Sequence, residues 1–350
     1  MTLLTLITKW KTMLIKNAEQ MKRVYGGVQR SMSFENWVAY LEEAEEFYIY
    51  PAIGTELYDE LSELVNSAND DDLTMTGTAK QKRLVKLLRM SLVAYADFSG
   101  MMRQVVSTGD AGKTQITPQN QQAVSKWATS ASMKSALRRG DDALERALKY
   151  LEENAADFTT WKESDCFLEK TGLLVNTATK LTEWFPAARG SRRMFIALEP
   201  GLRQAQAELG MSIGEAFMTT ILAKNKLWME ATLNDANWLK LLKMCGQVVA
   251  RKAVANSVPY MNIDGDWHLW SDTDGLENKD ILPAIRRAEI GAELTDQWKD
   301  GLGAIIEFLQ TTASGSVFAE YYTSPLYTAL VETPPTRLFE NKKDRSYGVL

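Results

Sequence analysis

The stretch IGTELYDEL at residues 53–61 decides the fold, because the chain carries a second copy of its pattern, IGEAFMTTI, at residues 213–221. In both stretches an Ile-Gly pair precedes apolar residues at helical spacing: Ile53, Gly54, Leu57 and Leu61 in the first, and Ile213, Gly214, Phe217 and Ile221 in the second. The two glycines are 160 positions apart (214 − 54). Each pair follows an amphipathic stretch that begins near a phenylalanine, Phe34 or Phe195. The pattern predicts a helix start at both glycines.

Three further pairs of stretches follow in the same order. KLLRM at residues 86–90 matches KLLKM at residues 240–244 with an offset of 154, and Asp110 matches Asp264 with the same offset. With an offset of 158, Asp142, Leu144, Leu148 and Leu151 match Asp300, Leu302, Ile306 and Leu309. The loss of six residues falls in the polar segment 66–78, where a deletion is tolerated. Matches in one order predict a tandem duplication, and two unrelated helical bundles are the alternative.

Helical periodicity dominates the remainder of the chain. Apolar residues recur at three and four positions within residues 34–48, 84–98, 195–209 and 298–309, whereas alternating, strand-like runs are scarce. Thr117 followed by Pro118 is a further helix start, with a capping hydroxyl before a proline. We therefore predict an all-α fold. It comprises two tandem, similar helical bundles and an extended C-terminal tail, at residues 1–165, 166–322 and 323–350.

The composition is that of an ordinary soluble globular chain, with 350 residues, 45% apolar and 24% charged. Forty basic residues against 45 acidic ones give a net charge of −5, whereas a nucleic-acid binder normally carries the opposite sign. The one histidine and two cysteines argue against His-rich zinc sites and a disulfide framework. The N-terminus lacks a basic region before its apolar residues, and no run is long enough to span a membrane. We expect a protein of the cytoplasm, or of a particle assembled there.

Two motifs imitate known ligand sites. Gly109 to Thr114 resembles a phosphate-binding loop, but Ser107 occupies the position of the required first glycine, so we expect a flexible interhelical loop. Asp264 to Asp266 and Asp272 to Glu277 resemble calcium loops, but with Gly275 at position six of the calcium-loop pattern, no carboxylate falls at position one or twelve. An irregular cation site is the alternative there.

No catalytic constellation is visible. His268 lies among tryptophans without a serine-elbow or cysteine signature elsewhere in the chain. The four glutamates Glu42, Glu43, Glu45 and Glu46 are expected on the wet face of a helix. We therefore expect no catalytic residue, no metal ligand and no cofactor, and an enzyme whose site the sequence does not reveal is the alternative.

The C-terminal tail combines prolines, apolar residues and basic residues. The adjacent Pro334 and Pro335 favour an extended chain. Residues 333–350 carry four basic and two acidic side chains, a net charge of +2. We expect this segment to dock on another subunit through Pro334, Pro335, Arg337, Leu338, Phe339, Lys342, Lys343, Arg345, Tyr347 and Leu350. Folding back onto its own bundle is the alternative.

The element from Tyr48 to Leu61, YIYPAIGTELYDEL, preceded by Leu6-Ile7-Thr8, resembles a domain of structural proteins of Bacteroides and crAss-like phages. Such proteins are similar to the all-α head-tail connector, or adaptor, proteins of tailed bacteriophages. The resemblance covers both halves, best at residues 34–61 and more loosely at residues 195–222. The duplication is a departure, because single-domain adaptors are shorter.

The resemblance implies a structural virion protein at the head-tail junction, assembled in the host cytoplasm. It implies a homo-oligomeric ring, twelve-fold as in the family, that lies beneath the portal protein and contacts neighbouring tail or ring proteins. The ring would surround the path of double-stranded DNA without reading its sequence, and an acidic lumen would let DNA slide. Another helical virion component, either a tail-completion ring or a cargo-type internal protein, is the alternative.

Overall fold

A computed structural model describes most of the chain. The described residues are 13–26, 33–65, 75–109, 112–115, 126–230, 232–263, 267, 269 and 281–328. Side chains are described in the same ranges except at 102–109, 112–115, 126 and 127. The predicted all-α fold is confirmed, with one short β-hairpin as the exception.

The first half is built around two long helices, α6 (Ala79–Val105) and α7 (Lys126–Glu153). Shorter helices precede them: α2 (Ala18–Tyr25), α3 (Glu35–Ala44), a π-helical turn (Glu45–Ile49), α4 (Tyr50–Ile53) and α5 (Thr55–Glu63). After α7 the chain forms a 3-10 turn (Ala155–Asp157), α8 (Thr159–Glu163) and α9 (Asp165–Thr171), which lead into the second half.

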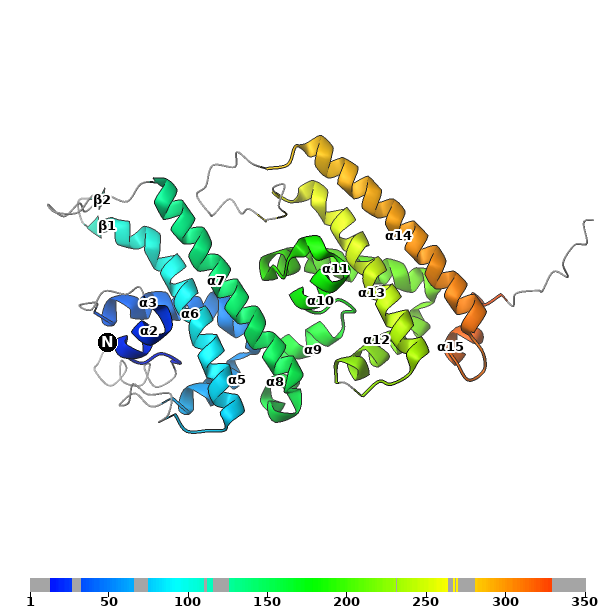
Figure 1. Cartoon of the computed structure of the whole chain (residues 1–350), viewed down its shortest axis with the longest axis horizontal. Coiled ribbons are helices and arrows are strands. Elements are labelled where there is room, and N and C mark those ends of the chain that lie inside the picture. The colour runs from blue at the N-terminus through cyan, green and yellow to red at the C-terminus, as the bar shows by residue number, and fades with distance from the viewer. Residues whose placement is uncertain are drawn as a thin grey trace, which may run out of the picture.

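The second half runs from α10 (Ala178–Trp184) to α15 (Ala319–Tyr322). Its long helices are α11 (Arg192–Ile213), α13 (Ala236–Ser257) and α14 (Ala284–Thr312). Its shorter elements are α10, a 3-10 turn (Pro186–Ala188), α12 (Glu215–Met229), a 3-10 turn (Val258–Tyr260) and α15. Figure 1 shows α7 in the middle of the molecule and α14 along an outer edge.

The main helices of the two halves can be paired in chain order, as the predicted duplication requires. A capped short helix comes first (α2, α10), followed by a helical segment ending at a glycine (α3 to α4, α11), a helix starting at that glycine (α5, α12) and a long pair (α6 and α7, α13 and α14). The burial of α6 and α13 agrees at the offset of 154: Leu84, Leu88, Leu92 and Tyr95 are buried, as are Trp238, Leu242, Gly246 and Val249. The superposition of residues 34–160 on 195–320 stays a prediction.

The two halves also start in a similar way, with a buried apolar segment followed by a capped short helix. This start is called here the entry of each half. Asn17 accepts a hydrogen bond from the backbone N–H of Gln20 and caps α2, and Thr177, 160 positions later, accepts one from Lys180 and caps α10. Before each cap lies a buried apolar segment, Met13-Leu14-Ile15 or Leu173-Leu174-Val175. Each half therefore begins by inserting such a segment into its own core.

Each half has its own core. One hydrophobic cluster runs from Met13 to Phe167 and the other from Leu174 to Tyr321. The break between them falls just after the predicted boundary at 165/166, because Phe167 packs on Trp161 of the first half at a ring-centroid distance of 4.6 Å.

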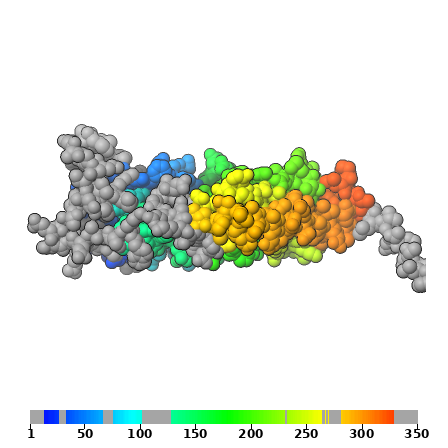
Figure 2. Space-filling model, turned by 90° about the horizontal axis from the view of Figure 1, so that it is seen from above, coloured from blue at the N-terminus to red at the C-terminus, as the bar shows by residue number. Residues whose placement is uncertain are grey.

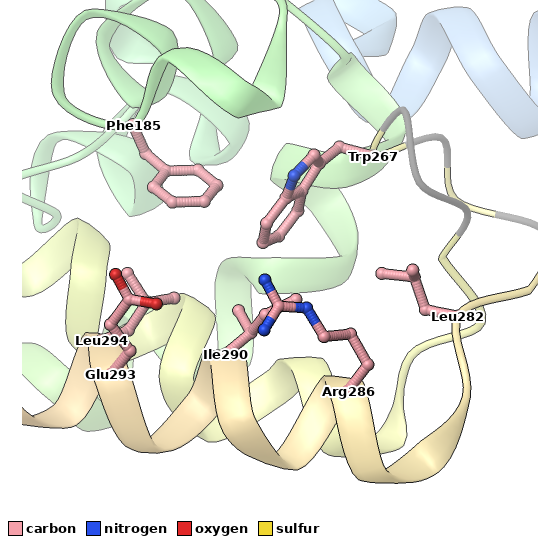
Figure 3. A pocket seen from close by; sticks show the side chains of 7 residues that line it. All are labelled: Phe185, Trp267, Leu282, Arg286, Ile290, Glu293 and Leu294. Atoms are coloured by element: carbon pink, nitrogen blue, oxygen red, sulfur yellow. The ribbon is translucent and has the colours of Figure 1, made fainter.

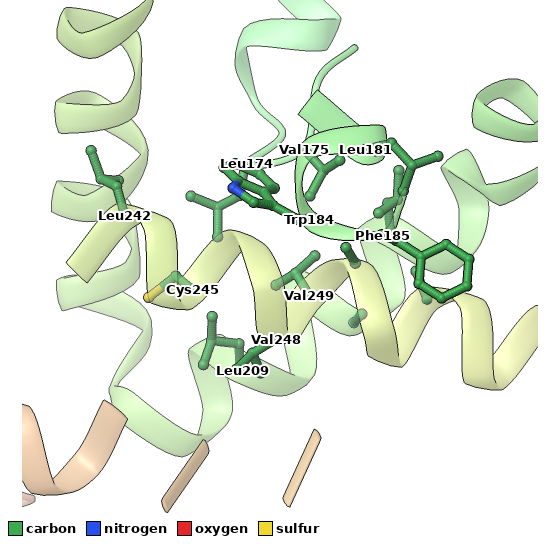
Figure 4. Close-up of a cluster of buried hydrophobic side chains, with 14 of the residues drawn as sticks. Leu174, Val175, Leu181, Trp184, Phe185, Leu209, Leu242, Cys245, Val248 and Val249 are labelled. Atoms are coloured by element: carbon green, nitrogen blue, oxygen red, sulfur yellow. The ribbon is translucent and has the colours of Figure 1, made fainter. Parts of the chain in front are cut away.

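In the second core the side chain of Trp184 lies directly on α13, as Figure 4 shows. Gly246 permits this contact, because a Cβ atom there would come within 2.3 Å of the Trp184 ring. Trp184, the last residue of α10, thus packs the end of that short helix onto the long helix α13.

Gly54 and Gly214 form equivalent joints. Each ends one helix and starts the next, with φ of +84° at Gly54 and +99° at Gly214, in a backbone region that L-residues rarely adopt. The N–H of each donates to the carbonyl four residues earlier, and its own carbonyl accepts from the residue four positions later. The predicted helix starts at Ile53-Gly54 and Ile213-Gly214 are confirmed.

Replacing Gly54 or Gly214 with alanine is expected to lower the free energy of unfolding by about 1–3 kcal/mol, because a Cβ is strained at these φ values. Chemical denaturation followed by circular dichroism measures the change. Gly303→Ala is the control, since Gly303 lies in α14 with open space around it, and the substitution should be neutral or stabilising. Joints that accept alanine without loss would refute the conformational argument.

Candidate functional site

The predicted docking segment lies outside the described residues. This holds for Pro334, Pro335, Arg337, Leu338, Phe339, Lys342, Lys343, Arg345, Tyr347 and Leu350. The repeat-defining residues are described: Ile53 and Ile213 are fully buried, each beside its glycine joint. The docking role of the tail stays a prediction.

The described chain leaves the second half from a fixed point on α14. The side-chain amide of Gln310 donates to the hydroxyl of Tyr321 (3.1 Å) and to the carbonyl of Leu326 (2.9 Å), and its oxygen accepts from the N–H of Thr328 (2.9 Å). Leu326 also contacts the second joint, 3.5 Å from where a Cβ of Gly214 would lie. The tail therefore begins at a defined place, at the outer end of the molecule in Figure 1.

The motif at residues 109–114, between α6 and α7, is part of a β-hairpin. The expectation of a flexible loop at this place is wrong. Strand β1 (Val106–Gly109) pairs antiparallel with β2 (Gly112–Gln115), and Gly109 pairs with Gly112. A phosphate-binding loop instead joins a strand to a helix N-terminus. The close spacing of the glycines fits a tight hairpin connection, which explains their presence without a nucleotide.

Replacing Lys113 or Asp272 with alanine is expected to change the free energy of unfolding by less than about 0.5 kcal/mol and to leave assembly intact, because neither belongs to a complete ligand motif. Thermal melting and size-exclusion chromatography measure these effects. A nucleotide bound at the hairpin, or an ordered cation at Asp272, would contradict this expectation.

Among the described residues no group of three or more His, Cys, Asp or Glu side chains could hold a metal ion. His268 and the acidic motifs at 264–266 and 272–277 lie outside the described residues. Within the described part, no helix is both long and apolar enough to cross a bilayer. Cys166 and Cys245 are both free thiols.

The junction between the two halves is polar and largely buried, which the sequence analysis did not predict. On α7, Asp141 accepts a hydrogen bond from the hydroxyl of Tyr95 (2.6 Å) and forms an ion pair with Arg193 (3.2 Å). Glu145 accepts from the backbone N–H of Thr179 (3.1 Å) and lies 3.7 Å from Arg192. One face of α7 thus meets the start of α10 and of α11.

Burial shifts the pKa values of three further groups near this junction. It raises the pKa of Glu152 to about 7, with Glu145 adding to the rise, and it lowers the pKa of Lys170 and of Lys180 to about 8. Lys180 also lies 4.9 Å from the centre of the Trp228 ring. Asp141 has a raised pKa for the same reason, burial. The junction therefore holds the halves together through charges with restricted access to water.

A second buried acid lies in the first half. The expectation that Glu45 faces water is wrong: Glu45 starts the π-helical turn, lies four residues after the buried Leu41, and is itself 3% exposed. The Tyr58 hydroxyl donates to Glu45 and accepts from the N–H of Leu14 (3.1 Å). Burial raises the pKa of Glu45 to about 8, with contributions from Glu42 and Asp59, while the hydrogen bond from Tyr58 opposes the shift.

A pocket of about 300 Å³ lies beside the N-terminal part of α14. Figure 3 shows Phe185 and Trp267 on one side and α14 side chains on the other, with Arg286 and Glu293 supplying the charges. The two aromatic rings meet edge to face at 5.0 Å. The lining is mostly apolar, so the pocket fits one large apolar side chain rather than a polar substrate.

Comparison with protein families gives one finding. Residues 49–170 match a family described as a family of unknown function (DUF6712), which is about a third of the chain and includes the Gly54 joint, α6 and α7. Neither the curated proteins nor the solved structures contain a match to this chain.

Proposed function

We propose that this protein is a structural component of a tailed bacteriophage, forming the head-tail connector ring beneath the portal. The repeated glycine joint carries the proposal. The element from Tyr48 to Leu61, on which the resemblance to phage connector proteins rests, forms a helix that turns sharply at Gly54 into a second helix. The same joint recurs at Gly214.

The fold supports a structural rather than a catalytic role. Its described long helices pack side by side into two cores joined by a buried polar junction, which is suited to bearing load between neighbours. The tail starts from a fixed point on α14, so a segment docking on a portal or an adjacent ring protein would have a defined origin.

In this role the copies surround the path of double-stranded DNA. The contact with DNA is non-specific, and the net charge of −5 favours sliding over adhesion. The ring has twelve copies, in line with the connector family that the sequence resembles, and the site of action is the head-tail junction of the virion.

Co-sedimentation of the purified protein with portal-bearing heads that lack their tails tests this proposal. The protein should pellet with such heads, and it should not pellet with capsids that lack the portal. Equal pelleting with both, or with neither, would contradict a connector role.

A further inference from the structure

The face of α7 that meets the second half has an equivalent on α14. At the offset of 158, Asp141, Leu144, Glu145 and Leu148 correspond to Lys299, Leu302, Gly303 and Ile306. On α7, α10 and the start of α11 cover Asp141 and Glu145, whose side chains are 13% and 12% exposed, whereas Leu144 and Leu148 belong to the core of the first half. The corresponding positions on α14 are partly or fully exposed.

This uncovered strip of α14, called here the α14 flank, is small in profile and carries one charged side chain, Lys299. It comprises Ala288, Ala292, Lys299, Gly303 and Ile306, which are within about 60° of one another around the helix at 100° per residue. Ala288, Ala292 and Gly303 are exposed, and a Cβ at Gly303 would meet nothing within 4 Å. Figure 2 shows the outer surface of α14 open along its length. Such small residues let another helix approach closely.

The molecule itself shows what covers this face. On α7 the cover is the entry of a half: the capped helix α10, followed by α11. The described part of the chain contains one other such entry, α2 followed by α3, with the equivalent cap position and a similar buried apolar segment before it. Because α2 lies in the first half of its own chain, only a second copy can bring it to the α14 flank by the same arrangement.

The C-terminal tail is a weaker candidate for this place. The elements that cover the equivalent face of α7 are both helices, α10 and α11. The tail contains the adjacent Pro334 and Pro335, which interrupt a helix.

We infer that the α14 flank docks a second copy of this chain through α2 and α3, so that copies join head to tail with the geometry that joins the two halves. This inference deepens the proposed ring and rests on it for the biological setting. A contact between two different faces continues from copy to copy, and it closes into a ring when the rotation per copy divides a full turn.

A matched pair of substitutions on α14 tests this inference. Ala292→Glu places a carboxylate on the flank, and Ala304→Glu places the same charge at an exposed position about 120° away around the helix. Self-association is measured by sedimentation velocity over a range of concentrations, and folding by thermal melting. The wild type and A304E should assemble alike, whereas A292E should require at least tenfold more protein, with an unchanged melting temperature.

Equal assembly of both variants, equal loss in both, or a wild type that stays monomeric would overturn the inference. A photo-crosslinker at position 292 identifies the occupant: a crosslink to residues 13–44 of another copy supports it, and one to residues 329–350 contradicts it. Attachment to portal-bearing heads is scored separately. Assembly that A292E disrupts, without attachment to heads, would refute the connector function while leaving the docking surface standing.

Discussion

Deletion of residues 333–350 is expected to abolish attachment to portal-bearing heads while leaving both bundles folded. The two described cores are built from residues 13–167 and 174–321. In the proposed complex Leu338, Phe339, Tyr347 and Leu350 supply buried contacts, at roughly 1.5–3 kcal/mol for each large apolar side chain fully covered. Loss of two such contacts already weakens binding by about a hundredfold.

Circular dichroism measures the folding of the deletion variant, and co-sedimentation measures its attachment to portal-bearing heads. A variant with Arg337, Lys342, Lys343 and Arg345 changed to alanine is the comparison, because removal of the charges should slow association and reduce its salt dependence more than its affinity. Lost helicity in the deletion would show that the tail belongs to the core. Undiminished attachment would place the docking surface elsewhere, near the tryptophans at 267–270.

Replacing Glu45 with glutamine is expected to remove a large pH dependence of stability. The pKa of Glu45 rises from 4.5 to about 8 on folding, so the folded state holds a proton that the unfolded state releases. Stability from this group is fully present below pH 4.5 and is lost as the pH rises through 8. Between pH 5 and pH 8 the loss is about 3 kcal/mol, and glutamine, which stays neutral and still accepts from Tyr58, avoids it.

The measured quantity is the difference in the free energy of unfolding between E45Q and the wild type, taken at both pH values. The difference cancels the titration of Glu152, Lys170 and Lys180, whose pKa values lie in the same range. It should grow in favour of E45Q by about 3 kcal/mol from pH 5 to pH 8. Glu46→Gln, at the exposed neighbour, is the control and should show little change. A difference that does not vary with pH would mean that Glu45 is ionised in the folded protein.

The helices were predictable because apolar periodicity is a local property of the sequence. Apolar residues three and four positions apart lie on the helix face that packs into the core. The joints were predictable because glycine adopts their positive φ values without strain, and an Ile-Gly pair stands at both places in the sequence. The entry segments were missed although a signal was present: Asn17 and Thr177 differ in residue type but cap in the same way, and Leu14-Ile15 pairs with Leu174-Val175. Chemical equivalence, rather than identity, marks the start of each half.

The burial of Glu45 was missed although the spacing carried it, because Glu45 lies four residues after the buried Leu41, on the same helix face. Other features depend on geometry that the pattern does not carry. The polar junction could not be predicted without knowing which helices meet. In the sequence, Asp141 and Glu145 look like the acidic residues of a solvent-exposed helix face. The predicted tail lies outside the described residues, so its docking side chains stay predictions.

Electron microscopy of the purified full-length protein, alone and mixed with the portal protein, tests the central claim most directly. The account predicts closed rings of one copy number in end-on views, stacked coaxially on the portal in side views, with twelve copies by resemblance to the connector family. Isolated elongated monomers that leave the portal bare at micromolar concentrations would contradict it.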